Sequence, residues 1–105
     1  MKAIRVHEFG DPNVLRYDDV PVPEPGPGEA RVKLAATGVN FIDTYHRKGQ
    51  YPGQLPLTLG HEIAGVVEQA GPQVRSLQLG DRVCLHYLLS CGDCYYCSVG
   101  SEQFC

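Results

Sequence analysis

The 105-residue sequence lacks any apolar run that approaches the roughly 20 residues needed to cross a bilayer. It also lacks an excess of positive charge, because nine Lys and Arg stand against twelve Asp and Glu, for a net charge of -3. A leader-like N-terminus is missing too, since Lys2, Arg5 and Glu8 place charges along the first segment. We therefore expect a cytoplasmic protein with neither a membrane nor a nucleic acid as a partner.

Internal repeats and low-complexity segments are also absent, so we look for one globular fold. Hydrophobic residues make up 43% of the chain and charged residues 20%, which is the balance of a soluble globular protein. A chain of 105 residues is the size of one domain with a single modest hydrophobic core. We expect one domain over residues 1–105.

The chain is divided into short segments by 12 glycines and 8 prolines, and apolar residues in these segments mostly alternate with a period of two. This pattern predicts a mainly β fold. Strands are expected over residues 4–7, 15–18, 29–36, 62–70 and 81–85. Within the third strand, Val32 and Leu34 should face inward, opposite Arg31 and Lys33. The segment 21–28 contains four prolines and should be an extended connection.

One short helix is predicted in the middle of the chain. Asp43 can cap a helix that runs through Lys48, and Gly49 can end it. One or two helical turns are expected there.

Four cysteines near the end of the chain give the strongest chemical signal. Cys91, Cys94, Cys97 and Cys105 follow a Cys-x2-Cys-x2-Cys-x7-Cys pattern in the loop-like residues 91–105, which we name the cysteine lobe. Four thiolates suit a tetrahedral structural zinc, and reducing conditions disfavour disulfides. An iron–sulfur cluster and unligated thiols are the alternatives. The fifth cysteine, Cys84, is expected to be a small buried core residue.

A second signal is the string GHEIAGVVEQAG, which begins at Gly60. In it, His61 and Glu62 stand at the entrance of a predicted strand. A histidine beside a carboxylate can bind a metal or move protons. Alone, the pair fits a histidine that is hydrogen-bonded in a turn equally well.

This string, followed by the cysteine lobe thirty residues after His61, resembles the medium-chain dehydrogenase/reductase superfamily. That superfamily contains the zinc-type alcohol dehydrogenases and the quinone oxidoreductases. The opening MKAIRVHEFG, the strand GEARVKLAATGVN and the turn LGDRV extend the resemblance over nearly the whole chain. It implies a GroES-like fold, which is a partly closed β barrel with short helices and forms the N-terminal catalytic domain of these enzymes.

Family members continue into a Rossmann domain that binds NAD(H) or NADP(H). Its Gly-x-Gly-x-x-Gly turn does not occur in residues 1–105. The sequence ends on the last expected zinc ligand, so we expect it to be a fragment that is inactive by itself. The family's cysteine lobe often lies near subunit contacts, which makes a homo-oligomer plausible.

The sequence departs from the alcohol dehydrogenase pattern at the catalytic zinc. In that subfamily the first zinc ligand is a cysteine at the position of Asn40, and the hydroxyl that relays the alcohol proton is at the position of Ile42. A neutral amide is a poor replacement for a thiolate on zinc. Asp43, in contrast, matches the aspartate that orients the zinc-binding histidine through a hydrogen bond.

The segment GVNFIDTYHRKGQYP resembles the quinone oxidoreductase branch, which typically works without catalytic zinc. The resemblance implies that Asn40 and Tyr45 line the nicotinamide and substrate cleft and orient the acceptor carbonyl. A turn-forming amide and a partly buried aromatic ring are the plain structural alternatives for these two residues. His46 and Arg47 are expected on the surface at the rim of the cleft.

His61 has two interpretations. It is either a vestigial ligand that is hydrogen-bonded to Asp43, or a ligand that holds a catalytic zinc together with Glu62 and a residue beyond this chain. We favour the absence of catalytic zinc.

Three functions remain open at this point. The favoured function is part of an NAD(P)H-dependent quinone or enone reductase that carries a structural zinc. The second is part of a zinc-dependent dehydrogenase that acts on an alcohol or aldehyde with an altered ligand set. The third is a zinc-stabilised binding module without enzymatic activity.

Overall fold

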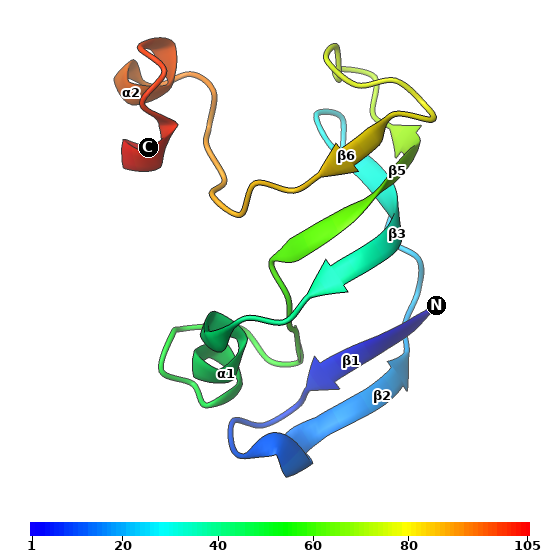
Figure 1. Ribbon diagram of the computed structural model, residues 1–105, viewed down its shortest axis with the longest axis vertical. Helices are drawn as coiled ribbons and strands as arrows, with labels where there is room; N and C mark the ends of the chain where they lie inside the picture. Colours follow the sequence, from blue (N-terminus) through cyan, green and yellow to red (C-terminus); the bar gives the residue numbers. More distant parts are fainter.

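The computed structural model describes all 105 residues as two small antiparallel sheets joined by loops and short helices (Figure 1). Its elements are β1 (Lys2–Val6), η1 (Pro12–Val14), β2 (Leu15–Asp19), β3 (Ala30–Gly38), α1 (Phe41–Arg47), β4 (Leu57–Thr58), β5 (Glu62–Ala70), β6 (Arg82–Cys84), α2 (Tyr95–Ser98) and η2 (Glu102–Phe104). The expected mainly β class is confirmed. None of the helices has the length and apolar character needed to cross a membrane.

The six strands form two three-stranded sheets, with the orders β2-β1-β4 and β3-β5-β6. No ladder joins the two sheets, so the strands do not close into the expected barrel. The connection between β2 and β3 explains part of this result. It contains four prolines, which have no N–H group to donate to a ladder, and it stays outside both sheets.

All five expected strands are present, with bounds that shift by a few residues. The two-residue strand β4 carries no alternation that sequence could reveal, and only its pairing with Arg5 and Val6 defines it. The cysteine lobe differs from expectation, because it contains the short helices α2 and η2 rather than loops alone.

The hydrophobic core is small, since only four residues are buried and only Val6 and Val67 bring large apolar side chains to it. Two burial predictions were wrong. Leu34 is 54% exposed although it lies on the face of β3 expected to point inward. Cys84 is exposed because β6 is a three-residue edge strand. Many large apolar side chains therefore remain at the surface.

Candidate functional site

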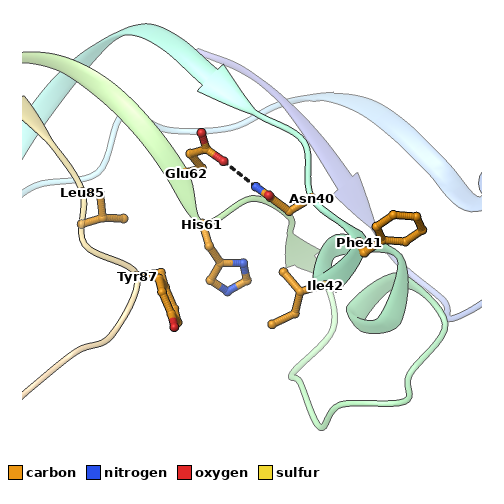
Figure 2. A pocket seen from close by; sticks show the side chains of 7 residues that line it. All are labelled: Asn40, Phe41, Ile42, His61, Glu62, Leu85 and Tyr87. Atoms are coloured by element: carbon orange, nitrogen blue, oxygen red, sulfur yellow. Dashed lines mark hydrogen bonds between the residues drawn. The ribbon is translucent and has the colours of Figure 1, made fainter. Parts of the chain in front are cut away.

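An open cleft of about 580 Å³ lies between the start of α1, the start of β5 and the segment that follows β6. Seven residues line it: Asn40, Phe41, Ile42, His61, Glu62, Leu85 and Tyr87. Figure 2 shows the His61 ring between Tyr87 on one side and Ile42 on the other. The cleft thus combines one amide, one imidazole and one carboxylate with apolar side walls.

The helix α1 is held at both ends by hydrogen bonds. Its N-cap is Asn40, whereas Asp43 was expected in that role. Asp43 occupies the third helical position and accepts a hydrogen bond from the Asn40 backbone N–H at 2.8 Å, as in a capping box. At the other end, the half-buried Arg47 donates from Nε to the Gly10 carbonyl at 3.1 Å, so it does not lie free on the surface as expected.

Asp43 also faces His61 underneath the cleft. The Asp43 Oδ1 and His61 Nδ1 atoms are 3.5 Å apart, and neither buried atom has a hydrogen-bond partner. Because a carboxylate oxygen accepts protons, this arrangement favours a proton on Nδ1 and leaves Nε2 as the second functional atom of the ring. The His46 ring stacks on the His61 ring with centroids 5.0 Å apart, and His46 also contacts Tyr51.

Asn40 and Glu62 form a second polar pair in the cleft. The Asn40 Nδ2 donates to Glu62 Oε2 at 2.7 Å. No Lys or Arg lines the cleft, so its charged groups are the Glu62 carboxylate and the nearby Asp43. Negative charge that develops on a substrate there would meet no Lys or Arg side chain in the cleft, and His61 is the one lining residue that can carry a positive charge.

The cleft brings together four of the five catalytic candidates, namely Asn40 and Asp43 at the start of α1 and His61 and Glu62 at the start of β5. The fifth, Tyr45, packs its ring against Tyr51 with centroids 6.1 Å apart and does not line the cleft. Its proposed contact with substrate stays a prediction.

Three lining residues were not found from sequence: Phe41, Leu85 and Tyr87. Leu85 and Tyr87 come from a segment more than twenty residues after His61, and no local motif marks them. Phe41 carried a weak signal, because it is a large aromatic residue next to Asn40 at the start of the predicted helical segment; the structure leaves it 83% exposed.

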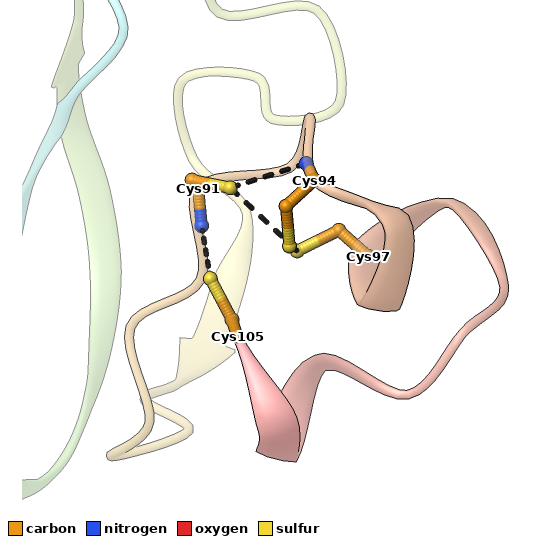
Figure 3. Close-up of side chains that lie close together, drawn as sticks. All are labelled: Cys91, Cys94, Cys97 and Cys105. Atoms are coloured by element: carbon orange, nitrogen blue, oxygen red, sulfur yellow. Dashed lines mark hydrogen bonds between the residues drawn. The ribbon is translucent and has the colours of Figure 1, made fainter.

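The cysteine lobe forms a separate cluster. Ligand atoms of three or more His, Cys, Asp or Glu residues converge only there, where the four sulfur atoms lie within 4.8 Å of one another. Figure 3 shows the four side chains turned toward a common point. The Sγ atom of Cys97 is 3.9 Å from that of Cys91 and 3.6 Å from that of Cys94.

These separations fit one tetrahedral ion. Four sulfurs at the usual zinc–sulfur distance of about 2.3 Å have edges of about 3.8 Å. In a four-iron cluster each thiolate binds a different iron atom, which requires wider spacing of the sulfurs. The donor set and its geometry are therefore suited to a single zinc ion more than to a cluster.

Backbone N–H groups and neighbouring thiols polarise the cluster. Hydrogen bonds from the backbone N–H groups of Asp93 and Cys94 and from neighbouring thiols lower the pKa of Cys91 from 9.0 to about 6. The Cys91 N–H lowers the pKa of Cys105, but the surrounding thiols outweigh it and raise this pKa to about 11. Four adjacent thiols cannot all ionise without a nearby cation, and a divalent metal would supply that charge.

The cysteine lobe has no core of its own. Neither α2 nor η2 contains a buried residue, and Figure 1 shows them apart from both sheets. Gly92 and Gly100 have φ values of 75° and 73°, a left-handed backbone that glycine adopts without the steric cost of a side chain. A lobe of this kind depends on cross-linking by a ligand for its order.

The comparisons with known proteins match this arrangement. The family model of the alcohol dehydrogenase GroES-like domain matches residues 26–105. An NAD-dependent alcohol dehydrogenase of Sulfurisphaera tokodaii is 37% identical over 100% of this chain and 32% of its own length. A quinone oxidoreductase of Pseudomonas aeruginosa is 51% identical over 78% of this chain and 26% of its own length.

Solved structures divide in the same way. A crystal structure of an NAD-dependent alcohol dehydrogenase matches this chain over 100% of its length and over 31% of the dehydrogenase chain. The sequence identity is 42% and the TM-score is 0.91. A mycobacterial quinone oxidoreductase covers 80% of this chain with 27% of its own, at 52% identity and a TM-score of 0.76. The chain thus spans about a third or less of the length of these relatives.

Proposed function

Because the chain belongs to the alcohol dehydrogenase GroES-like domain family of the medium-chain dehydrogenases and reductases, we propose that it forms the substrate side of an NAD(P)H-dependent oxidoreductase. Within that family we favour a reductase of quinones or enones. This choice rests on the side chains that line the cleft. They are an amide, an imidazole, a carboxylate and four apolar side chains, and none of them is a thiol.

The apolar walls suit a flat, conjugated acceptor. Ile42 and Phe41 on one side and Leu85 and Tyr87 on the other can contact a quinone ring or an enone while the polar residues meet its oxygen. Relatives of high identity support this substrate class, since they include the quinone oxidoreductase and a 2-haloacrylate reductase of a Burkholderia species that is 45% identical over 78% of this chain.

Reduction of such an acceptor adds a hydride to carbon and leaves negative charge on oxygen, which must gain a proton or a hydrogen bond. A bound NAD(P)H supplies the hydride. In its doubly protonated form, His61 can donate the Nε2 proton to that oxygen and become neutral, while the Asp43 carboxylate lies 3.5 Å from Nδ1 on the other side of the ring. Asn40 is the polar group that orients the oxygen, with one side of its Nδ2 group engaged by Glu62.

The nucleotide site is proposed to lie in a Rossmann domain outside residues 1–105, because the chain covers only 32% and 26% of the length of these relatives, one of which is named an NAD-dependent enzyme. That domain would cover the open side of the cleft. The exposure of Phe41 (83%) and Tyr87 (61%) is consistent with an apolar partner surface there.

The cysteine lobe is proposed to hold a structural zinc. Cys91, Cys94, Cys97 and Cys105 would be its four ligands and would leave no position for substrate. The zinc would order the lobe and take no part in hydride transfer.

A zinc-dependent alcohol dehydrogenase is the second candidate. It is favoured by the alcohol dehydrogenase relatives, which match the whole chain including the cysteine lobe, whereas the quinone oxidoreductases match about four fifths of it. In that case His61 would bind the catalytic zinc, together with Glu62 and a residue from outside this chain.

Steady-state kinetics of the full-length protein distinguish the two candidates. We expect NADPH or NADH to reduce 1,4-benzoquinone at a rate that mild chelation leaves unchanged. Oxidation of a primary alcohol by NAD(P)+ that chelation abolishes would instead establish the dehydrogenase. The variant Asn40→Cys is the matched control, because it restores a thiolate to the cleft. A second zinc per subunit should appear in this variant and not in the native protein.

A further inference from the structure

Glu62 lies across β3 at a place where only glycine leaves room for it. Gly38 and Glu62 are direct partners in the register of β3 and β5. A Cβ atom at Gly38 would overlap the Glu62 carboxylate, with the Oε1 atom only 2.8 Å away. Gly38 therefore provides the space that the carboxylate occupies.

From this position the carboxylate reaches Asn40, two residues after Gly38. The Glu62 Oε2 atom accepts the hydrogen bond from Asn40 Nδ2 at 2.7 Å (Figure 2). An ionised carboxylate has no proton to donate, so the amide nitrogen of Asn40 must face Glu62 and the amide cannot turn over. The backbone of Asn40 is fixed separately, through the hydrogen bond from its N–H to Asp43.

This hydrogen bond contributes little to the stability of the fold. Asn40 and Glu62 are both exposed in the cleft, where water competes for the same groups. What the pair does achieve is a single orientation for an amide that lines a substrate cleft.

We propose that Glu62, seated over Gly38, is a positioning residue that fixes the Asn40 amide for contact with the carbonyl oxygen of the substrate. This inference rests on the proposed function and assigns separate roles to the two residues. Asn40 touches the acceptor, and Glu62 acts through Asn40. The arrangement requires a Gly-x-Asn segment at the end of β3 and, opposite its glycine, a glutamate at the start of β5.

A double-mutant cycle in the full-length protein tests this role. With 1,4-benzoquinone as the acceptor, Glu62→Ala should lower kcat/KM by about tenfold or more, since a misaligned contact group costs that much. Gly38→Ala should do the same by displacing the carboxylate. In an Asn40→Ala background, Glu62→Ala should change kcat/KM by less than about twofold. The control Gly28→Ala, where an added methyl group meets nothing within 4 Å, should match the parent.

Glu62→Gln should restore most of the activity lost in Glu62→Ala, because a glutamine oxygen can still accept the Asn40 hydrogen bond. An equal loss from Glu62→Ala with and without Asn40 would overturn the proposal, since Glu62 would then act directly. No loss in the parent background would overturn it as well.

A second measurement separates this proposal from the proposed function. The NMR shifts of the Asn40 Nδ2 protons should move in Glu62→Ala and Gly38→Ala, and should stay in place in Gly28→Ala. Shifts that move in a protein without quinone reductase activity would refute the substrate class and support the positioning role. Shifts that stay in place in both variants would overturn the positioning role whatever the activity.

Discussion

Replacing Cys97 by serine should release the zinc that we propose for the cysteine lobe. The Sγ atom of Cys97 lies 3.6 Å and 3.9 Å from two of the other sulfurs, close to the edge of about 3.8 Å of a zinc–sulfur tetrahedron. Serine keeps the size of the side chain and removes the thiolate. Cys84→Ser is the matched control, because Cys84 is an exposed free cysteine outside the cluster.

The size of the effect follows from the number of ligands. Structural zinc sites contribute about 10–16 kcal/mol of binding free energy, so an equal share for one thiolate of four is about 2.5–4 kcal/mol. That loss corresponds to a decrease in zinc affinity of about 10²- to 10³-fold. The lobe has no buried residue in α2 or η2 to compensate for it.

The assay is zinc per subunit after dialysis against a competing chelator, followed by limited proteolysis. We expect the parent and Cys84→Ser to retain one lobe zinc and to resist cleavage. Cys97→Ser should lose the metal and be cut within the lobe. A Cys97→Ser protein with parental zinc affinity would refute the four-thiolate site, and so would loss of the lobe zinc from Cys84→Ser.

Three further predictions concern the framework of the site. Gly65→Ala should destabilise the protein by about 1–3 kcal/mol in urea unfolding, because its Cβ would overlap the Lys33 carbonyl of the paired strand, while Gly28→Ala should unfold like the parent. Arg47→Ala should lower the unfolding free energy by about 1 kcal/mol through the lost hydrogen bond to Gly10, and an unchanged midpoint would disprove that contribution. Chelation of the lobe metal should leave the β signal in circular dichroism unchanged, since both sheets are built without the lobe; a loss of that signal would contradict this.

Local patterns along the chain were enough to predict most of the secondary structure. Alternating apolar residues, one apolar run and one glycine turn predicted five of the six strands, and the polar start and glycine end of α1 predicted the helix. Strand β4 was not predicted, because a two-residue strand is defined only by its pairing with β1. The identity of the helix cap was also misassigned, since Asn40 and Asp43 are both good capping residues and only the backbone geometry distinguishes them.

The cysteine cluster was the part of the site that the sequence predicted best. Two-residue gaps keep Cys91, Cys94 and Cys97 close together whatever the rest of the fold does, and the seven-residue segment before Cys105 is short enough to return to them.

Only part of the cleft lining could be predicted from the sequence. His61 and Glu62 could be predicted because they are neighbours in the sequence. Leu85 and Tyr87 could not, because the pairing of β5 with β6 brings them to the cleft.

Residue types and short spacings along the chain were enough to predict the mainly β class, the family resemblance and the grouping of the four cysteines. The folded chain was needed to show which face of each strand is covered, that the two sheets stay separate, and that Glu62 contacts Asn40. The reason is physical. Burial and contact between distant residues depend on strand pairing, and pairing is a property of the folded chain rather than of any one segment.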